Sequence, residues 1–157
     1  MTTLENGQKA PNFSMPANGG ELVTLADYSG KWLVLYFYPK DDTPGCTTEA
    51  KTFTELKDKF TALNADIVGV SRDTVAKHEK FVAKHDLAVA LGSDEDGKVT
   101  EDYGVWVEKK MYGKTYMGIE RATYLINPDG AIEQIWRKVR VKGHVEAVLE
   151  ALESAHG

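Results

Sequence analysis

The chain has 157 residues, a net charge of −5 and one cysteine. This length predicts one domain, residues 1–157, with enough chain to bury a core. The negative charge argues against nucleic acid and membrane partners, since both require a basic face. A lone cysteine excludes an intrachain disulfide framework and indicates a reducing compartment. Because residues 1–13 also lack the pattern of a signal peptide, we expect a cytoplasmic protein.

The first predicted elements are a strand, a second strand and a helix. After a glycine-rich turn, residues 21–25 alternate in polarity as an edge strand does. Residues 32–38 are continuously apolar, which is typical of a central strand covered on both faces, and Pro39 ends this strand. A helix is predicted to follow, with Thr43 as its N-cap and Pro44 as its first residue.

This predicted helix carries one apolar stripe. Its members recur at spacings of three and four residues and are Ala50, Phe53, Leu56, Phe60 and Leu63. One turn further back the stripe reaches Cys46. We therefore expect the thiol to point toward the sheet and to be half-sheltered from solvent.

The rest of the chain continues the alternation and then adds a hairpin. The predicted elements are a buried strand at 67–70, a helix that Asp73 or Thr74 caps and that runs to about His85, a short strand at 89–91, strands at 122–126 and 132–136 joined by a turn at 127–130, and a helix at about 143–154. This order predicts an α/β protein with a thioredoxin-like fold, in which helices flank a mixed central β-sheet. Cys46 then follows the central strand, at the sheet edge where open α/β folds place their sites.

Residues 106–117 are rich in aromatic residues, methionine and lysine. The apolar members are Trp106, Met111, Tyr112, Tyr116 and Met117, with lysines at 109, 110 and 114. We expect a folded excursion that packs beside the site. A weak dimer surface is the alternative.

No metal or cofactor is predicted. His78 and His85 are seven residues apart, which is not a ligand spacing, and the four histidines form no cluster with other ligands. The chain also has no glycine-rich phosphate loop and no Ser-His-Asp pattern.

Cys46 is the candidate nucleophile. In the first turn of a helix, free backbone N–H groups and the helix dipole favour the thiolate, which is the reactive form. Gly45 allows close backbone approach, and the hydroxyl of Thr43 would face the same pocket in addition to capping the helix. The alternative is a buried, inert cysteine.

Three further residues are candidates for the same site. Arg121 precedes the 122–126 strand, and its planar guanidinium can hold a thiolate and an oxygen anion together; otherwise it is a solvated arginine. Glu49, one turn after Cys46, either orients that arginine or is a carboxylate that the helix dipole favours. Pro39 either shields the thiol from water or only ends the strand.

The pattern Pro39-x-x-x-Thr43-x-x-Cys46, followed by Arg121, resembles the active-site signature of peroxiredoxins. Residues 38–47, 110–114 and 118–121 resemble the bacterioferritin-comigratory-protein (PrxQ-like) subfamily, and the resemblance runs over about residues 5–155. It implies a thioredoxin-like fold and a thiol peroxidase without metal, haem or flavin. In such an enzyme Cys46 is the peroxidatic cysteine, and Pro39, Thr43 and Arg121 complete its site.

One departure from the subfamily concerns the resolving cysteine. Many members carry it five residues after the peroxidatic cysteine, where this chain has Lys51, and residues 81–84 lack the one that other members carry on the next helix. The chain therefore resembles the one-cysteine variants. An external thiol would have to reduce the sulfenic acid of Cys46: a thioredoxin, a glutaredoxin, a small thiol or Cys46 of another subunit.

We expect a monomer or a weak dimer that reduces hydrogen peroxide and organic hydroperoxides. The alternative function is a thioredoxin-like redox-sensing or binding module, which would form mixed disulfides through Cys46 without turning over peroxide. A structural role, in which Cys46 is dispensable, is a third reading.

Overall fold

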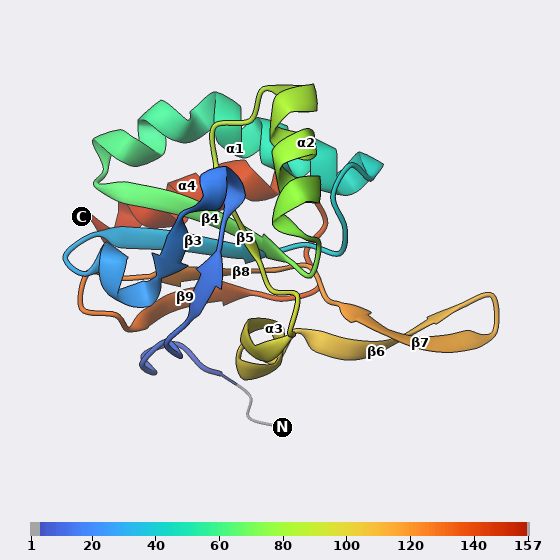
Figure 1. Ribbon diagram of the computed structural model, residues 1–157. Helices are drawn as coiled ribbons and strands as arrows, with labels where there is room; N and C mark the ends of the chain where they lie inside the picture. The colour runs from blue at the N-terminus through green and yellow to red at the C-terminus, as the bar shows by residue number, and fades with distance from the viewer. Residues whose placement is uncertain (1–3, 157) are drawn as a thin grey trace.

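The computed structural model describes residues 4–156. Residues 1–3 and 157 lie outside the described part, and so does the start of the N-terminal segment that was searched for a signal peptide. A five-stranded sheet forms its centre, in the order β5-β4-β3-β8-β9 (Figure 1). Its strands are β3 (Trp32–Phe37), β4 (Ala65–Ser71), β5 (Ala90–Ser93), β8 (Ala122–Ile126) and β9 (Ile132–Trp136). The first three run parallel, while β8 is antiparallel to β3 and β9 to β8, so the sheet is mixed as predicted.

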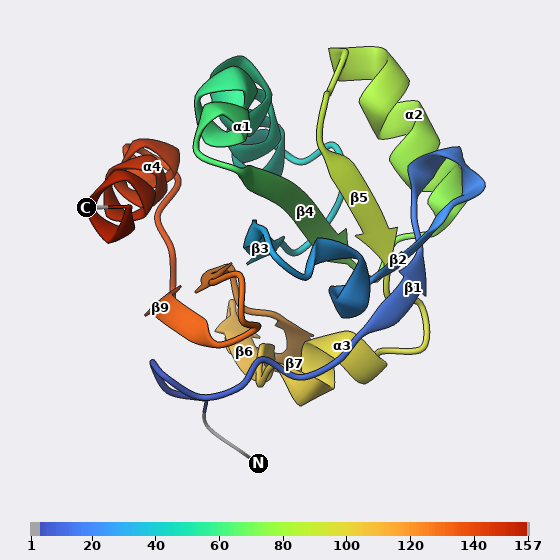
Figure 2. The same ribbon diagram turned by 90° about the vertical axis from the view of Figure 1, so that its left-hand side faces the viewer.

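Three helices cover one face of this sheet (Figures 1 and 2): α1 (Pro44–Ala62), α2 (Val75–His85) and α4 (His144–Ala155). The stripe predicted for α1 faces the sheet, since Phe53 and Phe60 are fully buried in a cluster with Val34 and Tyr36 of β3. The apolar face of α4, which includes Val148, completes that cluster. The run at 32–38 is apolar throughout because its alternate residues, such as Leu35, pack into a second core on the other face.

The opposite face is covered by short elements. These are β1 (Ser14–Pro16) paired with β2 (Leu22–Thr24), the 3-10 helix η2 (Leu25–Tyr28) and α3 (Lys98–Asp102) (Figure 2). Their apolar side chains, among them Met15 of β1, Val23 of β2 and Val99 of α3, close the second core. The 3-10 helix η1 (Asn18–Gly20), between β1 and β2, packs instead against α2 and β5. The sequence predicts neither β1 nor α3, because three and five residues are too few to show a period.

Two details of β3 position the site. Tyr36 lies across Gly69 of β4, where a Cβ atom would come within 2.6 Å of the tyrosine ring. Phe37 is opposite Ala122 in the antiparallel register, so the residue before β8 lies beside the end of β3 from which the chain enters α1.

The expectation for residues 106–117 is wrong in its outer half. β6 (Trp106–Met111) and β7 (Lys114–Ile119) form a two-stranded ribbon that projects from the body of the molecule (Figure 1). Tyr112 at its tip is 96% exposed, whereas Ile119 at its base is buried. The two strands satisfy each other's backbone hydrogen bonds, so the apolar residues at the tip do not need a core in order to be ordered.

Candidate active site

Cys46 lies in the first turn of α1, directly after the loop 38–43 that leaves β3. Thr43 occupies the N-cap position and Pro44 begins the helix, as predicted. The N–H groups of Gly45 and Cys46 have no acceptor within the helix, because they belong to its first three residues. Cys46 packs on the sheet side in the cluster with Val34 and Tyr36 and is only 2% exposed, so it is buried more deeply than the half-sheltered position predicted.

Arg121 lies against this sulfur. Its Nη2 atom donates to Cys46 Sγ at 3.3 Å, and its Nη1 atom donates to Glu49 Oε1 at 2.7 Å. The contact spans 75 residues of sequence and follows from the pairing of β8 with β3, which brings the start of β8 to the end of β3. Of the two alternatives for Glu49, the geometry favours orientation of the arginine, since its side chain is fully buried in an ion pair.

Burial governs the charges of this group. It raises the pKa of Glu49 to about 7, although Arg121 opposes the shift. Burial alone would lower the pKa of Arg121, but the charges of Glu49 and Cys46 outweigh it and the pKa is raised. The guanidinium therefore stays charged beside the thiol, while the carboxyl group of Glu49 changes protonation near neutral pH.

Two polar atoms near this group are left without partners. Among residues 4–156, the buried side-chain oxygen and nitrogen atoms that lack a hydrogen bond are Tyr36 Oη and Glu49 Oε2. Burial, reinforced by the charges of Glu49 and Cys46, raises the pKa of Tyr36 well above its ordinary value, so the phenol is neutral. Groups left unpaired in a native interior are costly and are concentrated where function requires them.

Gly45 allows the arginine to approach the helix. A Cβ atom at this position would lie 3.1 Å from Nη2 of Arg121 and 3.9 Å from Val141. A side chain here would thus press on the guanidinium that contacts Cys46. This is the close backbone approach that the sequence predicts for Gly45.

The expected side-chain cap of Thr43 is absent. Its hydroxyl donates to the carbonyl of Lys40 at 2.8 Å instead of accepting from the helix, so it tightens the loop while its oxygen can still accept. Pro39 is exposed on the same loop, and its role as a shield stays a prediction.

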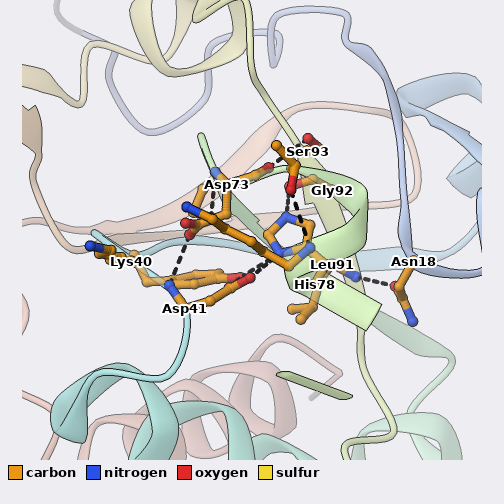
Figure 3. A network of polar contacts seen from close by, with 12 residues as sticks. Asn18, Lys40, Asp41, Asp73, His78, Leu91, Gly92 and Ser93 are labelled. Carbon is orange, nitrogen blue, oxygen red and sulfur yellow. Dashed lines mark hydrogen bonds and ion pairs between the residues drawn. The ribbon is translucent and has the colours of Figure 1, made fainter. Parts of the chain in front are cut away.

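A second buried polar group lies in this region, and the sequence does not predict it. Asp41 of the loop meets His78 of α2, 37 residues further along the chain (Figure 3). No periodicity links these positions; the one available signal was an acidic pair, Asp41 and Asp42, between an apolar strand and a helix start. In the part of the chain that the structure describes, no cluster of histidine, cysteine and acidic residues could hold a metal ion, and no helix is long and apolar enough to cross a membrane.

Known proteins resemble this chain in both sequence and structure. The AhpC/TSA family model matches residues 6–135. Peroxiredoxin Bcp of Bacillus subtilis is 51% identical over 150 residues, which cover 96% of each chain. A structure of Xanthomonas campestris bacterioferritin comigratory protein superposes with a TM-score of 0.88 at 47% identity over 92% of each chain. A Cys→Ser mutant of Xylella fastidiosa PrxQ gives 0.95 at 40% identity over the whole of both.

The fold and the buried thiol beside an arginine define the class: a thioredoxin-like protein with a single candidate reactive cysteine. The chain belongs to the AhpC/TSA family and, within it, to the Bcp (PrxQ-like) peroxiredoxins, which makes it a thiol-dependent peroxidase. Xanthomonas campestris peroxiredoxin Q has been solved as two different Cys→Ser mutants and so has at least two cysteines, whereas this chain has one.

Proposed function

We propose that Cys46 is the peroxidatic cysteine of a one-cysteine peroxidase. Its thiolate attacks one oxygen of the peroxide, so that an S–O bond forms as the O–O bond breaks. The leaving oxygen departs with the bonding pair and takes a proton to become water or an alcohol. Cys46 is left as a sulfenic acid, oxidised by two electrons. The observation that carries the proposal is the contact of Arg121 with both Cys46 Sγ and Glu49.

Arg121 stabilises the charge that moves from sulfur to oxygen during this step. Its guanidinium is held in place by Glu49 before peroxide arrives, so little reorganisation is needed when the O–O bond breaks. The free N–H groups of Gly45 and Cys46 supply further donors. The Thr43 hydroxyl contacts the bound peroxide, and Pro39 shields the thiol from water.

The proposed substrates are hydrogen peroxide and organic hydroperoxides. Support comes from the Xanthomonas campestris protein, whose structures concern alkyl peroxide reduction. The proposed chemistry requires only an O–O bond that reaches Cys46, so the group on the far oxygen is free to vary.

An external thiol completes the cycle. It attacks the sulfenic sulfur, releases water and forms a mixed disulfide with Cys46, and a second thiol then displaces Cys46 as the thiolate. The single cysteine, with Lys51 five residues after it, supports this route over an internal disulfide. We propose a thioredoxin, a glutaredoxin or a small thiol as the reductant, in a reducing compartment such as the cytoplasm, and a monomer or weak dimer as the working form.

The test compares wild type with Cys46→Ser. Wild type should consume peroxide at the expense of an added dithiol, and Cys46→Ser should not. Intact mass spectrometry after one equivalent of peroxide should show one added oxygen, replaced by a mixed disulfide when a monothiol is supplied. Equal peroxide consumption by both proteins would reject the proposal. A mixed disulfide without steady-state turnover would instead identify a redox-sensing module.

A further inference from the structure

A chain of buried hydrogen bonds lies behind the loop that precedes Cys46 (Figure 3). The Tyr38 hydroxyl donates to Asp41 Oδ1 at 2.5 Å, Asp41 Oδ2 lies 2.6 Å from His78 Nδ1, and His78 Nε2 lies 2.9 Å from the carbonyl oxygen of Gly92. A carbonyl oxygen only accepts, so Nε2 carries a hydrogen and one proton lies between Nδ1 and Asp41. His78 is fully buried and the Asp41 side chain is 5% exposed.

The backbone of the same loop is bound as well. The N–H of Asp41 donates to Asp73 Oδ2 at 2.8 Å, and Ser71 Oγ donates to the same oxygen at 2.6 Å. Ser93 Oγ in turn donates to the backbone carbonyl of Asp73 at 2.6 Å. Through Asp41 the loop is therefore fastened to α2 and to Asp73, just after β4, and Asp73 is in turn bound to the end of β5.

The residue after Asp41 shows that the loop needs fastening. Asp42 has a φ of 59°, in the left-handed region that costs free energy for most residues with a side chain, though less for aspartate. Its own contacts, to Lys84 at 2.7 Å and His85 at 2.8 Å, are at the surface, where ion pairs contribute little. The buried pair of Asp41 and His78 is thus, with the bond from the Asp41 N–H to Asp73, a main restraint on this turn.

The two steps of the proposed reaction require opposite positions of this loop. The peroxide step needs Cys46 held against Arg121, as found here. The reduction step needs a thiol to reach the sulfur of Cys46, a residue that is only 2% exposed, which a protein thiol cannot do while the loop is closed. Movement of the loop and of the first turn of α1 is therefore required between the two steps.

We propose that Asp41 and His78 are positioning residues that set the balance between a closed loop, competent for peroxide, and an open loop, competent for reductant. The pair touches neither peroxide nor sulfur and acts through the loop 38–43 on Thr43 and Cys46. This inference rests on the proposed function for the two steps, but the opening of the loop is measurable without either of them.

The experiment uses Cys46 as the only thiol of the full chain. Its alkylation rate is measured with iodoacetamide and with a maleimide attached to a bulky polymer, because the bulky reagent requires an open loop and the small one much less. His78→Leu and Asp41→Ala should each raise the ratio of bulky to small labelling about tenfold or more. Asp42→Asn, which tolerates the left-handed backbone and removes only a surface pair, is the matched control and should stay within about threefold of wild type.

Separate half-reactions distinguish positioning from general damage. In His78→Leu the peroxide step should slow about tenfold while reduction of the sulfenic acid by a protein dithiol becomes faster; a merely destabilised protein slows in both. The double variant Asp41→Ala/His78→Leu should be no worse than the worse single variant, since it leaves neither partner stranded. It also serves if a single variant does not fold. His78→Asn, whose amide can still donate to Asp41, should recover part of the loss.

An unchanged labelling ratio in the folded variants, or half-reactions that slow together, would overturn the inference. Loss of the proposed function is a separate result, because it would appear as peroxide turnover by Cys46→Ser while the labelling ratios stand unaffected.

Discussion

Two buried polar groups flank the loop between β3 and α1, and they differ in how completely their hydrogen bonds are made. In the group around Cys46, Arg121 has partners but Glu49 Oε2 and the nearby Tyr36 Oη have none. In the group around Asp41, both carboxylate oxygens and both ring nitrogens of His78 are engaged. An incomplete group retains capacity for a reacting molecule, whereas a complete one gains rigidity.

The two groups therefore have different roles on either side of one loop: the group around Cys46 serves the reaction, and the group around Asp41 holds the loop in position. Loss of a member of the first group should change the rate of the peroxide step and leave the loop closed. Loss of a member of the second should change both half-reactions in opposite directions. The predictions below test the first group, from the largest expected effect to the smallest.

Arg121→Lys should cause the largest loss after removal of Cys46 itself. Lysine keeps the positive charge but cannot contact Cys46 and Glu49 with one planar fork, so the peroxide step should slow by about 10²–10³-fold, the size expected for loss of a preorganised donor. Stopped-flow measurement of sulfenic acid formation provides the rate. Arg137→Lys, at a half-exposed arginine paired with Glu120, is the control. A rate within about threefold of wild type would remove Arg121 from the site.

Glu49→Gln should change how stability depends on pH. The folded-state pKa of Glu49 is about 7 against 4.5 for the ordinary side chain, so the folded protein binds this proton more tightly than the unfolded chain. Its contribution is fully present below pH 4.5 and is lost as the pH rises through 7, a change of roughly 3 kcal/mol.

The measurement is urea unfolding of wild type and Glu49→Gln across this pH range. The decline in the free energy of unfolding between pH 4.5 and about 7 should flatten in the variant. Glu150→Gln, at an exposed position of α4, should keep the wild-type slope. Parallel slopes for Glu49→Gln and wild type would show that burial does not perturb this carboxyl group.

Gly45→Ala should have the smallest effect of the three. The new methyl group would lie 3.1 Å from Arg121 Nη2, and the guanidinium must shift by a few tenths of an ångström to relieve the contact. We expect the peroxide step to slow about tenfold, as a small misplacement of a catalytic group allows. Lys51→Ala, on the exposed side of α1, is the control for alanine in this helix. An unchanged rate would show that the arginine has room to adapt.

The sequence predicts the elements whose residues repeat. The stripe of α1 is confirmed because a long amphipathic helix shows its period clearly, and with it the placement of Cys46 on the sheet side, although the residue is buried more deeply than the stripe predicts. Of the two candidate caps for α2, the structure selects Thr74, whose hydroxyl accepts from Lys77 N. The contact of Arg121 with Cys46 follows from the family signature and from the strand order, not from any local pattern.

What the sequence does not predict depends on pairs far apart in the chain. Asp41 and His78 meet only because α2 packs beside the end of β3, and neither position carries a local signal of the contact. The unpaired oxygen of Glu49 is likewise a result of packing. Aromatic residues and methionine are usually buried, so the composition of β6 and β7 predicts packing, whereas the two strands pair with each other and leave these side chains at the surface.

Gly69 has a consequence for the divergence of related sequences. Tyr36 can lie under the site only because Gly69 has no side chain beneath its ring. Any larger residue at 69 would overlap the ring of Tyr36, so we expect it to occur only together with a smaller residue at 36. Positions 36 of β3 and 69 of β4 thus fill one space between them, and we expect them to change together among related sequences.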